Sequence, residues 1–443
     1  MEIRLSDHFT YKKLLRFVLP SIVMMLVTMI YGVIDGFFVS NFAGKNAFAA
    51  INLIIPILVV VASFGFMIGA GGSALISFMM GKNDEQKARE VFTFITVLLF
   101  VFGVIASAVM FIFMEQIADL VGAKGELAHY GILYGRILIC FTPLNMLFNA
   151  FQSLMVTAEK PKFGLLISVI AGITNVVFDF LFVYVMKWGI AGAAAATAMS
   201  WSVGGIIPLV YFLKKRSSAL YFTKFKPDWR ALGKVCSNGS SEMVTNISTS
   251  IVAMLYNFQL LRLAGENGVA AYGVIMYVSY VFLAISMGYS VGAAPVVGYH
   301  YGADNTDELK GILKKSLFIM LISGIIATLL SEILTDVMAK IFVGYDAELC
   351  DMTSYALRAY AISFIISGFN IFGSAFFTGL GNGAVSAAIS FLRTFLFQIA
   401  AVFILPIMFG VNGIWFAVVA AEGLTLIVTA IMFVVYRKKY KYC

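Results

Sequence analysis

The sequence predicts an all-α protein that crosses a membrane many times, and three observations lead to this fold class. First, 61% of the 443 residues are hydrophobic and only 12% are charged, whereas a soluble domain carries about 25% charged residues. Second, the mean hydropathy is +0.94. Third, the apolar residues form long continuous runs rather than the alternating segments of a strand barrel. A bilayer is therefore the expected solvent, which argues against a soluble enzyme.

Twelve apolar runs are long enough to cross a bilayer, since a spanning helix needs about 20 mostly apolar residues. Charged or turn-forming residues separate each run from the next. We number the predicted spans one to twelve in chain order. They cover residues 14–39, 47–79, 91–114, 129–156, 163–186, 190–213, 237–261, 269–299, 311–334, 352–378, 384–408 and 412–436.

The basic residues indicate the orientation of these spans. An even number of spans places both termini on one side, and 23 of the 31 Lys and Arg residues fall on that side, against five on the other. The remaining three, Arg136, Arg358 and Arg393, fall in or near spans. Because cytoplasmic loops carry an excess of Lys and Arg, we expect both termini in the cytoplasm and the protein in the inner (plasma) membrane. The net charge of +8 then reflects topology rather than nucleic-acid binding.

The two halves of the chain repeat each other at a spacing of 221 residues. Residues 42–50, FAGKNAFAA, align with residues 263–271, LAGENGVAA, and with one inserted residue Arg136 aligns with Arg358. Six spans in each copy predict two lobes related by a pseudo-twofold axis along the membrane normal. Such repeats place the substrate between the lobes and move by rocking. We expect an N-lobe at 1–213, a cytoplasmic loop at 214–236 and a C-lobe at 237–443.

Two carboxylates fall inside predicted spans of the N-lobe. Asp35 lies late in span one, and Asp179 lies in span five with Asn175 four residues before it, on the same helix face. A carboxylate in the membrane interior costs a few kcal/mol and is functional by default. At the repeat spacing Asp35 aligns with Tyr256 and Asp179 with Ala401, so the pair occurs in one lobe only. This asymmetry is typical of a coupling site rather than of a structural contact.

The chemistry of such a pair leaves two coupling ions open. Burial disfavours the ionised form of a carboxyl group and a second carboxyl nearby disfavours it further, so the pair can take up and release a proton. Carboxylate oxygens with Asn and Thr oxygens can instead hold Na⁺, a hard cation that prefers oxygen ligands. Either ion shifts a conformational equilibrium by its differential affinity for the two states. We expect no cofactor besides this ion.

Other polar residues provide further candidates. Pro20 in span one removes a helix hydrogen bond and permits a bend. Glu242, near the start of span seven, and Glu422, in span twelve, are carboxylates to which the sequence assigns no role. A cavity rich in methionine and aromatic residues suits varied apolar substrates, because such side chains repack. Our candidates for its polar lining are Tyr31, Asn257, Asn370 and Gln398.

Together these features resemble the multidrug and toxin extrusion (MATE) family, in the branch of the DinF- and MepA-type exporters. The resemblance covers essentially the whole chain and rests on the twelve spans, the repeat and several short motifs. The motifs are Pro20 with Asp35, the segment 44–50, the Asn175-x-x-x-Asp179 pair, and Gly192-Ala-Ala-Ala-Ala-Thr197. The resemblance implies that Pro20 bends span one and that the coupling ion, H⁺ or Na⁺, binds at Asp35, Asn175, Asp179 and Thr197.

The resemblance also implies an activity. It indicates an antiporter, not an enzyme, that exports cationic or amphipathic drugs by alternating access in exchange for H⁺ or Na⁺. In another branch acidic residues stand on spans seven and ten, whereas this chain has Ser250 and Ser367 there, so no C-lobe Na⁺ site is implied. We expect small-molecule substrates and membrane lipid as partners, no nucleic acid, and a monomer. The alternative is a lipid-linked saccharide flippase of the same superfamily, which would need a cationic cavity for pyrophosphate.

Overall fold

The computed structural model describes residues 3–43, 45–214 and 219–442, and within these ranges its regular elements are all helices. The predicted all-α fold class is confirmed. Some residues used in the sequence analysis lie outside the described ranges: Gly44 of the repeated segment, and Lys215 and Arg216 of the predicted loop at 214–236.

The described residues of the first half form seven α-helices and two π-helical turns. They are α1 (Tyr11–Phe38), η1 (Val39–Ala43), α2 (Lys45–Gly81), α3 (Glu85–Ile112), α4 (Met114–Leu120), α5 (Glu126–Thr157), α6 (Pro161–Asp179), η2 (Phe180–Val185) and α7 (Gly189–Phe212). The second half adds α8 (Trp229–Gly302), α9 (Thr306–Val343), α10 (Ala347–Ala361), α11 (Ser363–Gly379), α12 (Gly383–Phe391), η3 (Leu392–Leu396), α13 (Phe397–Phe409), α14 (Val411–Trp415) and α15 (Ala417–Tyr440).

Helix α8 is a hairpin of two spans rather than one rod. Gly265 interrupts its 74 residues with φ 65° and ψ −156°, a conformation that glycine adopts without strain. The rings of Tyr256 and Tyr272 stack with centroids 4.9 Å apart, whereas in a continuous helix these residues would be about 24 Å apart. The chain therefore reverses direction at Gly265.

The structure contains the predicted twelve spans. Ten helices of the described chain are long and apolar enough to cross a membrane, and α10 with α11, bent by 44°, forms an eleventh. The second arm of α8 supplies the twelfth. Most helices extend a few residues past the predicted runs, because their end turns carry charged residues that the search for apolar runs leaves out.

The loop between the halves is shorter than the predicted segment 214–236, because α8 already begins at Trp229. Asp228 caps this helix by accepting a hydrogen bond from the Ala231 amide at 2.9 Å, and its carboxylate pairs with Lys87 at 3.1 Å. These two interactions hold the pKa of Asp228 below its ordinary value. The added helical turns carry the charged residues Arg230 and Lys234, so they give no signal of a spanning run.

The internal repeat is present in the backbone as well as in the sequence. The ion pair of Arg136 with Glu115 at 2.9 Å recurs as Arg358 with Asp336 at 2.9 Å. Positive φ angles also recur in pairs at a spacing of 221 or 222 residues. These pairs are Asn83 and Asp304 (60° and 52°), Glu159 and Gly381 (61° and 71°), and Gly189 and Gly410 (57° and 58°).

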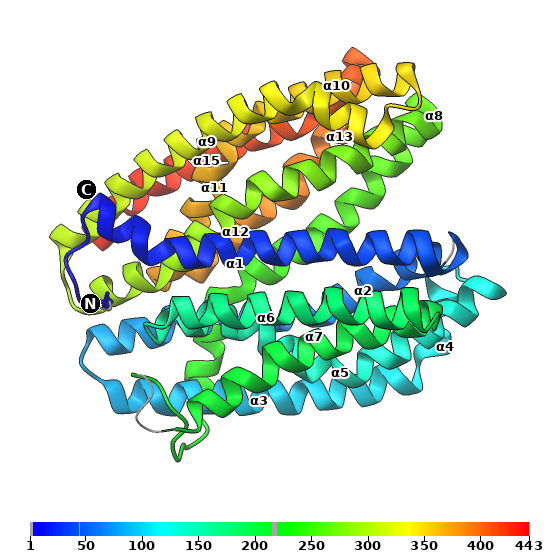
Figure 1. Ribbon diagram of the computed structural model, residues 1–443. Helices are drawn as coiled ribbons and strands as arrows, with labels where there is room; N and C mark the ends of the chain where they lie inside the picture. The colour runs from blue at the N-terminus through cyan, green and yellow to red at the C-terminus, as the bar shows by residue number, and fades with distance from the viewer. Residues whose placement is uncertain (1–2, 44, 215–218, 443) are drawn as a thin grey trace.

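The helices form two bundles that lie close together at the end that holds both termini and diverge toward the other end (Figure 1). Glycines permit backbone contact where the bundles meet. A Cβ at Gly71 of α2 would lie 1.9 Å from the Val235 oxygen, and one at Gly239 of α8 would lie 1.8 Å from the Met67 oxygen. At the far end of α1, a Cβ at Gly36 would meet nothing within 4 Å. The bundles are therefore closed against each other on the side of the termini.

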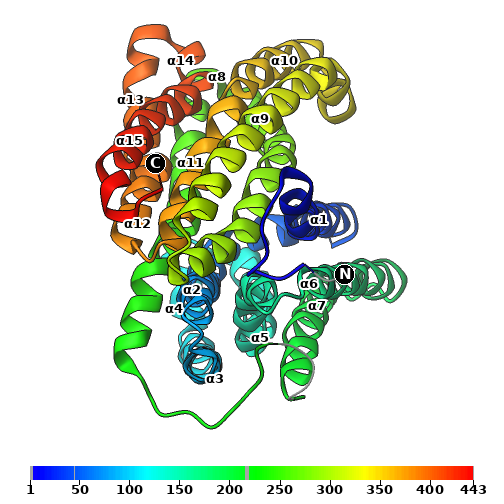
Figure 2. The same ribbon diagram turned by 90° about the vertical axis from the view of Figure 1, so that its left-hand side faces the viewer.

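Residues 3–10, here called the strap, tie the two bundles together at this closed end. The Leu5 amide donates to Glu159 Oε1 at 2.7 Å, in the turn between α5 and α6. The Phe9 amide donates to Glu308 Oε1 at 2.8 Å, and His8 Nδ1 contacts Glu308 Oε2 at 2.6 Å, in the first turn of α9. Figure 2 shows this dark-blue segment between the two bundles.

We predict that Glu308→Ala loosens the strap. Hydrogen bonds to a charged group contribute about 1.5–3 kcal/mol each, and the buried Phe9 amide would lose its acceptor. Trypsin should therefore cleave after Arg4 faster in the variant than in the unaltered protein. Asp7→Asn is the matched control, because the Asp7 carboxylate pairs with Lys13 in the first turn of α1, so its loss leaves the strap's hydrogen bonds to Glu159 and Glu308 in place. Equal cleavage rates for Glu308→Ala and Asp7→Asn would contradict the prediction.

Candidate coupling site

The site forms where three helices of the first bundle converge. Asp35 lies on α1, Asp179 is the last residue of α6, and Thr197 lies on α7. Thr197 Oγ1 donates a hydrogen bond to Asp35 Oδ1 at 3.4 Å. The side chains of Asp179 and of Asn175, one turn earlier on α6, lie close to the Asp35 carboxyl group. The structure thus brings together the four residues that the sequence analysis selected.

The site is rich in acceptor oxygens that lack donors. Asp179 is 0% exposed and Asn175 1% exposed. Neither carboxylate oxygen of Asp179, nor Asn175 Oδ1, has a hydrogen-bond partner among the described residues. Buried polar atoms are normally paired, and two adjacent carboxylates repel each other unless a proton or a cation lies between them. This set of oxygen atoms therefore fits either a proton shared between the two carboxyl groups or a hard cation such as Na⁺.

Sequence reasoning missed Tyr134, which completes the wall of this site. Tyr134 lies on α5, is 3% exposed, and faces Thr197 and both carboxylates. Its own span carries no carboxylate, so nothing in its local sequence distinguishes it from other membrane tyrosines. Tyr31 lies one turn before Asp35 on α1, and its ring packs against Gly172 of α6, where a Cβ would lie 3.2 Å from Tyr31 Cδ1.

Both carboxylate-bearing helices change geometry directly after the site. The π-turn η1 begins at Val39, one turn beyond Asp35, and η2 begins at Phe180, next to Asp179. Pro20 lies buried within α1, which continues through it. The residues that follow contact the second bundle, because a Cβ at Gly288 would lie 2.5 Å from Ile22 Cα.

The candidate cavity residues are dispersed rather than gathered. Tyr31 lies beside the coupling site, and Asn257 is exposed on the first arm of α8. Gln398 accepts a hydrogen bond from the Tyr256 hydroxyl at 3.0 Å. Asn370 is 0% exposed, and its amide donates a hydrogen bond to Glu422 inside the second bundle. Asn370 therefore lies within that bundle and not on its surface.

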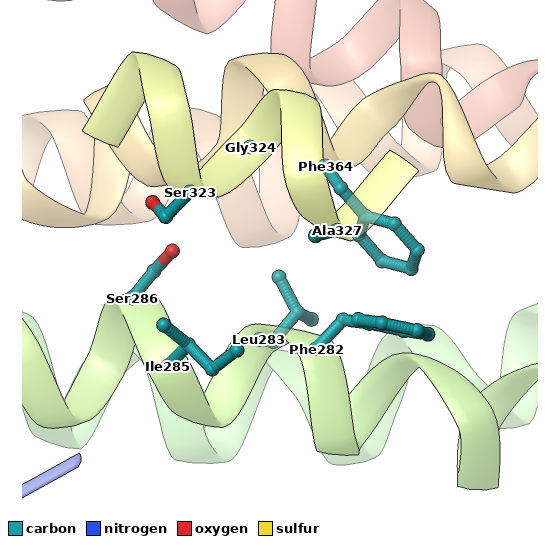
Figure 3. Close-up of a pocket in the computed structure, with 8 residues that line it drawn as sticks. All are labelled: Phe282, Leu283, Ile285, Ser286, Ser323, Gly324, Ala327 and Phe364. Atoms are coloured by element: carbon teal, nitrogen blue, oxygen red, sulfur yellow. The ribbon is translucent and has the colours of Figure 1, made fainter. Parts of the chain in front are cut away.

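Two small pockets lie away from the charged residues. One lies between α8, α9 and α11, where the hydroxyls of Ser286 and Ser323 face each other beside the ring of Phe364 (Figure 3). The other lies in the first bundle beside Met24 and Gln152. Among the described residues that line them, none is charged, so neither pocket resembles the coupling site.

The fold and the site together define a class of protein: a two-lobed membrane transporter of twelve spans, which is not an enzyme. The chain belongs to the MatE family, whose model matches residues 20–181 and again residues 243–404, once in each half. The confirmed family is the one that the sequence motifs indicated.

Relatives and solved structures agree with this assignment. The multidrug export protein MepA of Staphylococcus haemolyticus is 27% identical, over 96% of this chain and 93% of its own. MepA of Staphylococcus saprophyticus is 24% identical over the same shares. The fold is similar to an outward-facing multidrug resistance MATE family transporter, with a TM-score of 0.93, 23% identity and 98% of both chains covered. A MATE crystal structure in the straight conformation gives a TM-score of 0.92 at 22% identity, again over 98% of both chains.

Proposed function

We propose that this protein is an antiporter that exports cationic or amphipathic drugs by alternating access, in exchange for H⁺ or Na⁺. The observation that carries the proposal is the cluster of oxygens at Asp35, Asn175 and Asp179 in one lobe, where Asn175 Oδ1 and both Asp179 carboxylate oxygens are buried without a hydrogen-bond partner among the described residues. The names of its relatives, which are multidrug export proteins, support the substrate class. No cofactor is required beyond the coupling ion.

The proposed orientation follows from the distribution of charge. Because 23 of the 31 basic residues fall on the side of the termini, that side is the cytoplasm and the membrane is the plasma membrane. The bundles are closed against each other at this side, so the structure corresponds to an outward-facing state. The protein acts as a monomer.

Coupling would run through α1, which carries Asp35 and also contacts the second bundle. Val18 and Ile22 of α1 pack directly against Gly292 and Gly288 of α8. An ion that neutralises the carboxylates removes their repulsion and changes how α1, α6 and α7 pack around them. Because α1 also makes the contact between the bundles, that change favours closure of the bundles at one side of the membrane over closure at the other. The size of the shift is set by the difference in the ion's affinity for the outward-facing and inward-facing states. Pro20 lies within this contact segment, between Val18 and Ile22, and provides a bending point there.

The flippase alternative is less well supported. A lipid-linked saccharide carries a pyrophosphate that requires unpaired basic residues in the cavity. The three arginines in or near spans are all paired with acids, and these pairs are Arg136–Glu115, Arg358–Asp336 and Arg393–Glu422. The arginines therefore provide no net positive charge.

Ethidium efflux measured in everted membrane vesicles tests the proposed function. We expect dye movement when a proton gradient or a Na⁺ gradient is imposed, and the gradient that drives it identifies the coupling ion. Dye movement that is the same with and without both gradients would contradict ion coupling. Accumulation of a lipid-linked precursor on depletion of the protein, without any change in drug sensitivity, would favour the flippase.

A further inference from the structure

Basic and aromatic side chains gather at the closed end of the molecule, where Figure 1 marks the C-terminus. Five exposed basic residues there are here called the basic rim. They are Lys82, which follows α2, and Arg437, Lys438, Lys439 and Lys441 at the end of α15. Cations at the C-terminus of a helix interact favourably with its dipole. The dipole does not explain why the ends of α2 and α15, which belong to different bundles, are joined by packed side chains.

The end of α15 is held against the second bundle rather than extended as a loose tail. Lys441 takes a left-handed conformation (φ 53°, ψ 37°), and its amide donates a hydrogen bond to the Arg437 oxygen at 2.8 Å. The chain turns back after it, so that the Tyr442 hydroxyl donates to the Phe433 oxygen at 2.9 Å and Tyr442 is 1% exposed. Because Tyr442 is anchored, the basic residues that precede it stay at the surface of the bundle.

A row of aromatic rings joins the two parts of the basic rim. Lys82 Nζ lies 4.6 Å from the centroid of the Phe78 ring on α2, in the first bundle. The Phe78 ring packs on Tyr301 of α8 with centroids 5.5 Å apart, and Tyr301 packs on Tyr440 of α15 at 5.4 Å. Lys439 Nζ lies 5.2 Å from the Tyr440 centroid, in the second bundle. Each bundle therefore places one ammonium group over the same aromatic row.

This aromatic row adjoins a contact that closes the two bundles against each other. A Cβ at Gly81 of α2 would lie 2.1 Å from the Tyr299 oxygen, and one at Gly302 of α8 would lie 2.1 Å from the Phe78 oxygen. Lys82 directly follows Gly81, and Tyr301 directly precedes Gly302. A ligand that contacts lysines of both bundles here would bridge them at a point where they must separate.

Positive charge is in excess at the basic rim. Within residues 3–43, 45–214 and 219–442, no ion pair joins any of its five members to a carboxylate. The acids that adjoin it in the chain are fewer. Asp84 caps α3, Glu85 pairs with Arg89, and Asp304 follows α8. The surface is therefore complementary to an anion.

We propose that the headgroup of an anionic phospholipid, such as phosphatidylglycerol, binds at the basic rim and bridges the two bundles. Clusters of about 4–8 Lys and Arg residues directly beside a spanning helix attract anionic lipids. Tyrosine rings suit the same depth, because they have an apolar body and a polar tip. A headgroup in contact with Lys82 and Lys439 stabilises the closed end. The inference rests on the proposed orientation, in which this end faces the anionic cytoplasmic leaflet.

The test measures lipid selectivity and closure separately, with the full-length protein in nanodiscs. Nanodiscs of phosphatidylcholine are compared with nanodiscs that also contain phosphatidylglycerol in both leaflets, so that the orientation of the protein does not matter. Spin-labelled lipids report by their restricted motion how strongly each lipid is held. In separate samples without native cysteines, spin labels at residues 162 and 310 report the distance across the closed end. Both positions are exposed, near the starts of α6 and α9 in the two bundles.

The variant is Lys82→Gln/Lys439→Gln, which removes one ammonium group from each bundle. The matched control is Lys224→Gln/Lys226→Gln, which removes two exposed lysines from the loop between the halves. Both double variants lose the same net charge at the same end of the molecule. They therefore separate binding at the basic rim from a general attraction of this end to anionic lipid.

We expect Lys82→Gln/Lys439→Gln to lower the preference for phosphatidylglycerol by about fivefold or more, as for the loss of a lysine near an anionic surface. The control should keep the preference. Phosphatidylglycerol should shorten the distance between the labels in the unaltered protein but not in Lys82→Gln/Lys439→Gln.

Four outcomes would overturn the proposal. They are no preference for phosphatidylglycerol in the unaltered protein, an unchanged preference in Lys82→Gln/Lys439→Gln, an equal loss in the control, and a distance that does not respond to phosphatidylglycerol. None of these measurements uses drug export. Absent efflux from vesicles together with intact lipid selectivity would therefore count against the proposed function and leave this inference standing.

Discussion

Asp35→Asn and Asp179→Asn are each expected to reduce ion-driven drug efflux to the level of vesicles without the transporter. An amide is nearly the same size as a carboxyl group, but it cannot exchange a proton at neutral pH and is a weaker ligand for Na⁺. The fold should persist, because neutralising one of two adjacent buried carboxylates removes repulsion and desolvation cost. The measurement is gradient-driven ethidium efflux from everted vesicles, with thermal unfolding of the purified variants as the check on folding.

The matched control for these substitutions is Asp336→Asn. Asp336 is also an aspartate on a spanning helix, but it is 60% exposed and pairs with Arg358 away from the site. Exposed ion pairs contribute about 0–1 kcal/mol, so this variant should keep its efflux rate. Efflux at the unaltered rate from the double variant Asp35→Asn/Asp179→Asn would refute the coupling site, whichever ion drives export.

The fold was accessible from the sequence because the bilayer imposes a strong and local signal. Every span must satisfy its backbone hydrogen bonds internally, so twelve apolar runs predict twelve helices. The start of α8 at Trp229, earlier than the predicted span, has the same cause. The first turns of α8 lie outside the apolar run, and Asp228 caps them as it would in a soluble helix. The strap could not be predicted from the sequence for a related reason: its amides donate hydrogen bonds to Glu159 and Glu308, which are far away in the sequence.

The coupling site could be predicted where its residues lie on one helix or are charged residues within an apolar span. Asn175 and Asp179 are one turn apart, and Asp35 is costly in an apolar span. Tyr134 and the pairing of Arg393 with Glu422 depend on contacts between helices, which spacing along one chain does not encode. Glu422 received no role from the sequence for this reason, although the structure shows it fully committed to Arg393 and Asn370.

Gly71→Ala is expected to open the closed end of the molecule. The added methyl group would lie 1.9 Å from the Val235 oxygen and 2.8 Å from the Gly239 nitrogen. Both are backbone atoms that no side-chain rotation can move, so α2 and α8 must separate. Overpacking costs about 1–3 kcal/mol. If the outward-facing state bears this cost alone, its population relative to an inward-facing state falls about 5- to 150-fold.

Spin labels at residues 82 and 234, in a background without native cysteines, measure this separation as an increase in their distance. Gly273→Ala is the matched control on α8, because a Cβ there meets nothing within 4 Å. The clash lies between the bundles rather than within one, so each bundle should keep its core and the variant should remain folded. A distance distribution for Gly71→Ala identical to that of Gly273→Ala would show that this crossing does not set the closed state. A longer distance would identify the contact between α2 and α8 as the gate that alternating access must break.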